Sequence, residues 1–363
     1  MDLPPTMTAS RRLFSSGAPD AAGSLASMAC VLALAFLFVG CGGGSTNSVS
    51  IDGSSTVFPM TEAVAEEFMQ ANQGARVNVG VSGTGGGFSK FLRGDIAIND
   101  ASRPIAPEEK KKAKENGIEY IEIPVAYDGL AVVVHPKNDW VDCLTADELK
   151  QIWRPDSEVN RWNQIRDDFP DRPLDLYGPG TASGTYDYFT EAIVGEAEAS
   201  RSDFTASEDD NVLVQGIKGT ETSLGYFGLA YYENNADDLK ALGVDPDARN
   251  SGASCVQPSA QTVQNGTYRP LSRPLFIYVN TAKITPVVEK FVEFYLQNAD
   301  ELATDVGYVG MPDEAYELAL ERFRSRTTGT IFGAEGVDVT GTKVEEMLRT
   351  ASEGTAPDTT SEE

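Results

Sequence analysis

The sequence predicts an α/β fold, because strand and helix signals alternate along the chain. Three turns rich in serine and glycine support this prediction, since each follows a strand signal and precedes a helix signal. They are Gly53–Pro59, Ser82–Gly87 and Ser183–Thr185. Such alternation is typical of mostly parallel sheets flanked by helices. No linker separates two sequential halves. We therefore expect a two-lobe clamshell in which the chain crosses from one lobe to the other more than once.

Length and composition allow two hydrophobic cores of ordinary size, with 363 residues of which 41% are hydrophobic. The formal net charge is −26. Nucleic acid is not an expected partner, because phosphate backbones attract basic surfaces. The acidic surface favours solubility, including solubility in high salt.

Residues 1–40 have the features of an export signal, with Arg11 and Arg12 ahead of an apolar run from Ala29 to Val39. This run is too short for a comfortable membrane span, and a buried helix is the alternative. It ends in Phe-Val-Gly-Cys, which resembles a lipobox, so Cys41 is the predicted lipidation site. Ser10–Phe14 also resembles a twin-arginine signal, and the export route stays open.

Residues 41–48 are rich in glycine and serine and predict a flexible tether. Residues 350–363 predict a disordered acidic tail. Cys30 leaves with the signal, so Cys143 and Cys255 remain as a predicted disulfide in an exported protein. The chain has no Cys-x-x-Cys motif or Cys/His cluster, and we expect no metal site or cofactor.

Several segments support their assignments by side-chain pattern. Alternating valines place Val77, Val79 and Val81 on one face of a strand. Pro59 suits the first turn of a helix, and Thr145 with Glu148 matches a capping box. Strands are expected at 76–81, 96–99, 120–126, 130–135, 174–177, 224–232 and 275–279. A turn at 127–129 is expected to separate the strands 120–126 and 130–135. Helices are expected at 59–72, 88–93, 107–116, 185–194, 286–298 and 313–324.

The three serine-rich turns predict an oxyanion site. In open α/β folds ligands bind outside the carboxyl ends of strands, where these turns lie. Helix N-termini there offer N–H groups and small hydroxyls, which hold an oxyanion without a metal. The candidate ligands are Ser55, Thr56, Val57, Ser82, Ser183, Gly184 and Thr185.

Three further residues complete the candidate site. Ser102 and Arg103 follow a strand, and Arg103 can clamp an oxyanion with two hydrogen bonds. Asp128 lies at a predicted strand end. Hydrogen phosphate carries a proton and can donate a hydrogen bond to this carboxylate, whereas sulfate cannot, so Asp128 would select phosphate.

Each of these residues has a simpler interpretation. Ser55, Thr56 and Ser183 could be helix caps, and Ser82–Gly87 a tight turn. Arg103 could form a surface ion pair, and Asp128 with Gly129 is also a turn signal. Only their joint occurrence favours an anion site.

Nothing in the sequence requires catalysis. His135 is the one histidine and precedes Pro136 at a strand end. The chain has no Gly-x-Ser-x-Gly elbow and no P-loop. A binding protein is therefore the prediction, and a secreted phosphoesterase is the rival from another class.

The quoted turns, together with Ala101–Ile105, Tyr177–Thr185 and Pro270–Asn280, resemble the PstS-type periplasmic phosphate-binding proteins, in their SphX-like branch. The resemblance covers about residues 49–350. It implies a hinged clamshell, without catalytic activity, that binds inorganic phosphate tightly outside the cytoplasm.

The resemblance also implies delivery of phosphate to a membrane-embedded ABC permease, by a monomer anchored through lipid on Cys41. Lobe one would comprise residues 49–126 and 273–349, and lobe two residues 127–272. The same fold with sulfate or molybdate is the alternative. One departure concerns charge: many members have aspartate at the position of Arg103 and an arginine shortly before the Ser-Gly-Thr turn, where residues 177–182 have none.

Overall fold

The computed structural model describes residues 47–181, 183–207, 209–246, 255–333 and 343–352. The predicted signal peptide, Cys41, most of the tether and the tail from residue 353 lie outside these residues. Within them, no helix is long and apolar enough to cross a membrane.

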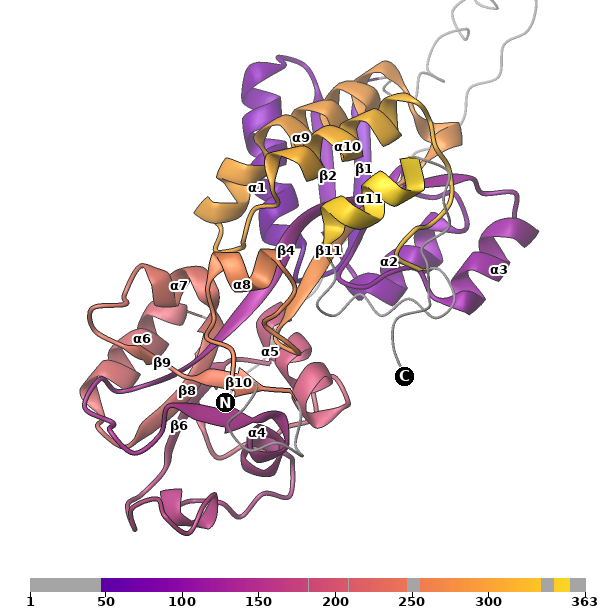
Figure 1. Ribbon diagram of the computed structural model, residues 1–363. Coiled ribbons are helices and arrows are strands. Elements are labelled where there is room, and N and C mark those ends of the chain that lie inside the picture. The colour runs from indigo at the N-terminus through magenta and orange to yellow at the C-terminus, as the bar shows by residue number, and fades with distance from the viewer. Residues whose placement is uncertain (1–46, 182, 208, 247–254, 334–342, 353–363) are drawn as a thin grey trace, which may run out of the picture. The chain divides into compact units, whose positions relative to one another are not determined.

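The described residues form a mixed nine-stranded sheet in the order β2-β1-β3-β11-β4-β8-β6-β7, with β9 paired to β4 (Figure 1). A smaller sheet pairs β10 with β5. The strands are β1 Ser48–Gly53, β2 Arg76–Val81, β3 Ile98–Ala101, β4 Tyr120–Val134, β5 Cys143–Thr145, β6 Asp175–Pro179, β7 Thr205–Ser207, β8 Ser223–Gly228, β9 Lys240–Ala241, β10 Gly243–Asp245 and β11 Ser272–Asn280.

Helices flank the sheet. They are α1 Phe58–Ala71, α2 Gly83–Phe91, α3 Pro107–Glu115, α4 Ala146–Trp153, α5 Gly184–Phe189, α6 Asp210–Gly219, α7 Leu229–Glu233, α8 Ala260–Gln264, α9 Pro286–Asp305, α10 Asp313–Arg324 and α11 Val344–Ser352. Short helical turns η1 Trp162–Gln164 and η3 Thr281–Lys283 are 3₁₀, and η2 Thr190–Val194 continues α5 as a π-helix. Because β1 begins at Ser48 and α11 ends at Ser352, the predicted tether and tail each overlap regular structure at one end.

Two parallel groups of strands are joined by an antiparallel centre. β1 runs parallel to β2 and β3, and β6 runs parallel to β7 and β8. Between them β11 is antiparallel to β3 and β4, and β4 is antiparallel to β8. The long strands β4 and β11 thus connect the two groups, as Figure 1 shows.

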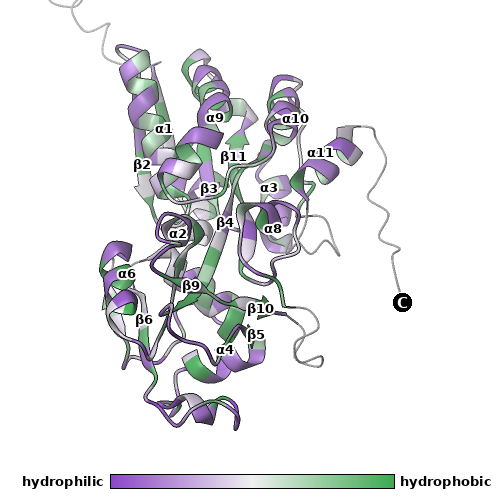
Figure 2. Cartoon of the chain, turned by 60° about the vertical axis from the view of Figure 1, so that its left-hand side comes forward, coloured by the Kyte–Doolittle hydropathy of each residue, from purple (hydrophilic) through white to green (hydrophobic). Residues whose placement is uncertain are grey.

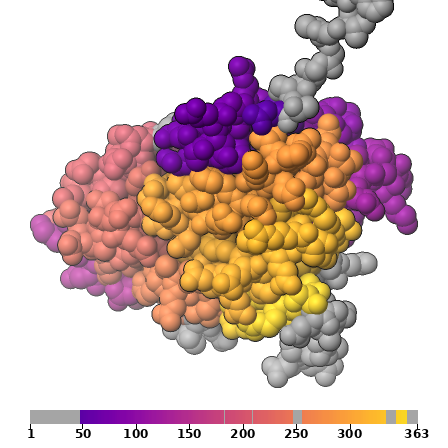
Figure 3. Space-filling model, turned by 90° about the horizontal axis from the view of Figure 1, so that it is seen from above, coloured from indigo at the N-terminus to yellow at the C-terminus, as the bar shows by residue number. Residues whose placement is uncertain are grey.

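The hydrophobic core follows the strands and the helix faces turned toward them (Figure 2). On one side α1 packs against α9, where the Phe68 and Phe291 rings lie 5.3 Å apart. Figure 3 shows the N-terminal segment, in indigo, beside the orange segment on this face. In the other group Trp153 packs against Tyr226, with ring centroids 4.9 Å apart.

Local sequence signals at α4 and its neighbours match the structure. Thr145 Oγ1 accepts from the Glu148 N–H at 3.1 Å, and Glu148 Oε2 accepts from the Thr145 N–H at 2.8 Å, which confirms the capping box. Cys143 on β5 and Cys255 beside β10 form a disulfide, with Cα atoms 6.2 Å apart.

The prediction of two strands separated by a turn at 127–129 is wrong. β4 is one continuous strand of 15 buried residues, and Asp128 lies inside it. Pairing with β11 runs through this point, with Ser272 opposite Gly129. Gly129 serves close packing here, because a Cβ atom would lie 3.0 Å from the Val263 side chain.

The prediction that a helix begins at Phe88 after a glycine turn is also wrong. α2 begins at Gly83, so the glycines form its first turns. A Cβ atom on Gly87 would lie 2.6 Å from the Cα of Gly53. The glycines therefore let α2 lie directly on the end of β1.

Asp100 on β3 is fully buried beneath the turn that follows β1. Its carbonyl oxygen accepts from the Ser54 N–H at 3.0 Å. Burial raises the pKa of its carboxyl from 3.8 to about 8; the hydroxyl of Thr61 opposes this shift and the charge of Asp52 adds to it. Asp100 is thus protonated in the folded protein at neutral pH.

This proton makes folding stability depend on pH. Between about pH 4 and pH 8 the folded state keeps a proton that the unfolded chain releases, so stability falls as pH rises, by at most about 1.4 kcal/mol per pH unit. Asp100→Asn should flatten this dependence in denaturant unfolding at pH 5, 7 and 9. The exposed Asp95→Asn is the matched control. Parallel curves for wild type and Asp100→Asn would refute the assignment.

Candidate anion-binding site

A cavity of about 430 Å³ lies where the starts of α1 and α5 meet β4. Its polar lining includes six of the residues that the sequence predicts. These residues are Ser55, Thr56, Asp128, Ser183, Gly184 and Thr185, and Asp210, Val306, Gly307 and Tyr308 add to the wall.

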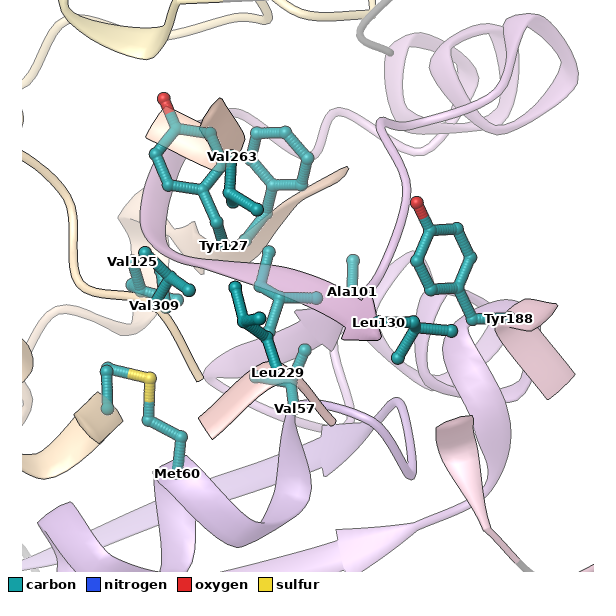
Figure 4. Close-up of a cluster of buried hydrophobic side chains, with 14 of the residues drawn as sticks. Val57, Met60, Ala101, Val125, Tyr127, Leu130, Tyr188, Leu229, Val263 and Val309 are labelled. Carbon is teal, nitrogen blue, oxygen red and sulfur yellow. The ribbon is translucent and has the colours of Figure 1, made fainter. Parts of the chain in front are cut away.

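The start of α1 borders this cavity. Ser54 Oγ accepts from the Thr56 N–H at 3.2 Å, and the Ser54 carbonyl accepts from the Phe58 N–H at 3.0 Å. The Val57 N–H makes no hydrogen bond within the described part of the chain. The Val57 side chain is buried in the hydrophobic cluster drawn in Figure 4, and this packing holds the turn in place.

The start of α5 repeats this arrangement. Ser183 Oγ accepts from the Thr185 N–H at 3.2 Å, so the serine does cap the helix, as its simpler interpretation says. Gly184 lies directly against Thr56: a Cβ atom there would be 2.7 Å from both the Thr56 N and Cα atoms. Two helix N-termini therefore meet at one place, and their dipoles both favour an anion there.

Arg273 on β11 lies behind this wall and is 9% exposed. Its Nη2 donates to Thr56 Oγ1 at 3.4 Å, and its Nε lies 3.5 Å from Asp128 Oδ2. The guanidinium stacks over Tyr188, with Cζ 3.7 Å from the ring centroid. Arg273 was not among the predicted ligands, although it lies in the segment Pro270–Asn280 that resembles the PstS-type proteins.

Asp128 is 1% exposed and lies opposite Arg273 in the β4–β11 register. Burial raises the pKa of its carboxyl from 3.8 to about 6, and the charge of Arg273 opposes the shift. Asp128 is therefore mostly ionised at pH 7 and can accept a hydrogen bond. Among the described residues neither Asp128 Oδ2 nor Arg273 Nε completes a hydrogen bond.

Val57, Ser82, Ser102 and Arg103 do not line the cavity in this structure. Ser82 donates to Oδ1 of Asp52. The other carboxylate oxygen of Asp52, Oδ2, forms an ion pair with Lys90 Nζ at 2.5 Å. Arg103 forms a two-pronged ion pair with Glu109, both contacts being 2.9 Å.

Ser102 instead lies beside α2. Its amide donates to Thr84 Oγ1 at 3.2 Å, and the two hydroxyls are 3.1 Å apart. Thr84 is the second residue of α2 and not part of a turn, so it was not among the predicted polar neighbours of this segment.

Acidic side chains lie around Arg273 behind the cavity wall. Glu191 Oε2 lies 3.5 Å from Arg273 Nη1. Burial, followed by the charge of Glu198, raises the pKa of Asp187. The site consequently offers an anion hydrogen-bond donors rather than excess positive charge.

The fold and the cavity define a periplasmic-binding-protein clamshell, and residues 42–299 match the PBP superfamily domain. The chain is 52% identical over 297 residues to Protein SphX of Synechocystis sp., a match that covers 81% of this chain and 87% of that protein. It is 38% identical over 287 residues to the phosphate-binding protein PstS of Staphylococcus saprophyticus, covering 76% and 86% respectively. The chain therefore belongs to the SphX and PstS family of phosphate-binding proteins.

Solved structures agree with this assignment. A possible phosphate binding protein from Planctomyces limnophilus superposes with a TM-score of 0.73 at 45% identity, over 77% of this chain and 98% of that one. A substrate-binding protein from Clostridium perfringens, solved with bound phosphate, gives a TM-score of 0.52 at 26% identity, over 73% and 100%.

The contact between Gly184 and Thr56 can be tested by one methyl group. Gly184→Ala should force the two helix starts apart and weaken anion binding about 10- to 100-fold, as overpacking does elsewhere. Gly219→Ala is the matched control, because a Cβ atom there meets nothing within 4 Å. Titration calorimetry with phosphate measures both. Equal affinities of the two variants would contradict the arrangement.

Arg273 and Arg103 should differ in their effect on binding. Arg273→Gln should weaken phosphate binding at least about tenfold, since it removes the charge behind Thr56 and Asp128. Arg103→Gln should cost less than about threefold, because Arg103 must first give up its ion pair with Glu109 before it can contact phosphate. Calorimetry gives the affinities and thermal unfolding checks that both variants fold. The reverse order would assign the main charge to Arg103.

Proposed function

We propose that this protein binds inorganic phosphate, as hydrogen phosphate, outside the cytoplasm and delivers it to a membrane-embedded ABC permease. The observation that carries the proposal is the meeting of two helix N-termini on a cavity backed by the Asp128–Arg273 pair. Two comparisons support the proposal. The chain matches its family along most of its length, and one similar protein was solved with bound phosphate.

The phosphate oxygens would receive hydrogen bonds from both helix starts. We assign the α1 start, Ser55 to Val57, and the α5 start, Ser183 to Thr185, as direct ligands. Arg273 offsets the charge of Asp128 and donates a hydrogen bond to the Thr56 hydroxyl behind the helix starts. Such charge-assisted bonds in a site removed from water give tight binding.

Ser82, Ser102 and Arg103 would join the ligands only by exchanging partners. Ser82 would leave Asp52, and Arg103 would leave Glu109. We include them as contacts that the first lobe adds around bound phosphate.

Asp128 would set the choice of anion. Its ionised carboxylate accepts a hydrogen bond from the O–H group of hydrogen phosphate, whereas sulfate at neutral pH has no proton to share and would place two like charges together. Sulfate or molybdate is the second candidate ligand of the same fold.

Binding would close two lobes. We place the first at residues 49–126 and 273–349, the second at 127–272, and the hinge in β4 and β11 near Ala126 and Arg273. Closure that depends on contacts made only in the shut state links phosphate binding to recognition by the permease.

Two further parts of the proposal are that the protein is anchored to the membrane and that it has no catalytic activity. The protein would be a monomer held at the membrane through lipid on Cys41. It would bind phosphate without turnover: His135 accepts from the Lys137 N–H at 3.0 Å and does not line the cavity, so it activates no nucleophile there. A phosphoesterase would hydrolyse p-nitrophenyl phosphate with or without divalent metals, and such turnover would refute the binding-protein proposal.

The selectivity of Asp128 is testable by calorimetry. At pH 7 the wild-type protein should bind phosphate and reject sulfate. Asp128→Asn should lower the ratio of phosphate affinity to sulfate affinity by about tenfold or more. The amide removes the carboxylate charge that repels sulfate and offers a hydrogen-bond donor. Equal affinity of wild type for the two anions would refute the role of Asp128.

A further inference from the structure

Glu191 is the one exposed carboxylate in direct contact with Arg273 among the described residues. It lies on η2, the π-helical continuation of α5, whose first residues line the cavity. Its Oε2 is 3.5 Å from Arg273 Nη1, and its side chain is 56% exposed while that of Arg273 is 10% exposed. A π-helical turn often occurs at functional sites.

Arg273 divides its donors among three directions. Nε faces Asp128, Nη2 faces Thr56, and Nη1 faces Glu191. Two carboxylates thus share one guanidinium. With both ionised, the group carries a net negative charge before any ligand arrives, which is unusual behind an anion site.

Glu191 also acts on neighbours of this group. The pKa of Arg103 is raised, chiefly by its hydrogen bond to Glu109, and the charge of Glu191 contributes to the same shift. The pKa of Asp187 is raised by burial and by the charge of Glu198, while Glu191 adds to that shift as well. Its field therefore extends over both arginines near the cavity.

We propose that Glu191 is a specificity-determining residue, whose carboxylate offsets the charge of Arg273 so that charge alone does not hold an anion in the site. An anion must then satisfy the helix N–H groups and also donate a hydrogen bond to Asp128. Because Arg273 shares its charge with Glu191, it offsets less of the charge of Asp128, so an anion without a proton is repelled there more strongly than hydrogen phosphate. The inference rests on the proposed phosphate-binding function and deepens it.

The test compares Glu191→Gln with Glu196→Gln, which removes the same charge from an exposed position just beyond η2. Calorimetry with inorganic phosphate and with sulfate at pH 7 gives both affinities for each variant. Glu191→Gln should tighten phosphate binding about two- to fivefold and sulfate binding by more, so that the phosphate-to-sulfate ratio falls. Glu196→Gln should leave the ratio unchanged.

Two results would overturn the proposal. Weaker phosphate binding by Glu191→Gln would mean that Glu191 orients Arg273. An unchanged ratio of phosphate affinity to sulfate affinity would mean that solvent screens the charge of Glu191 from the site. Thermal unfolding shows whether each variant is folded. Failure of the wild-type protein to bind phosphate would refute the proposed function instead, so the two failures are distinguishable.

Discussion

The cross-strand pair of Asp128 and Arg273 is the interaction on which the site depends. The two residues face each other in the antiparallel register of β4 and β11, the strands that join the two parallel groups of the sheet. Both side chains are buried, so neither charge would be tolerated alone. Their pairing allows a carboxylate and a guanidinium to lie behind the cavity wall, in the strands that we propose as the hinge. A ligand that contacts Asp128 therefore acts directly on the connection between the groups.

The helix starts add what the ion pair lacks. A paired arginine has little net charge to offer an anion, and Glu191 offsets it further. The N–H groups of α1 and α5 have no such partner of opposite charge, and a helix dipole places positive potential at each start. Their approach requires glycine at position 184, because a side chain there would overlap Thr56. Recognition is thus distributed over backbone donors, which cannot be changed by substitution as easily as a charged side chain can.

The sequence predicted those parts of the fold and the site that are encoded locally. Pro59 marked the start of α1, the Ser-Gly-Thr turn with its Ser183 cap marked the start of α5, and the capping box marked α4. What it missed depends on long-range pairing. Asp128 with Gly129 has the local character of a turn, yet β11 holds both residues in a continuous strand. Arg273 enters the site only because that register places it opposite Asp128, and no local pattern around Arg273 specifies its partner.

The acidic character of the chain is compatible with this kind of site. A formal net charge of −26 repels anions at long range, but exposed charges are screened beyond about 8 Å at physiological ionic strength. The donors at the two helix starts act within hydrogen-bonding distance and from partly buried positions, where salt screens them little. In the proposed site, an anion would therefore be recognised by its shape and its proton, after the long-range repulsion has been screened. Surface charge and selectivity would then be independent, because the two properties depend on different distances.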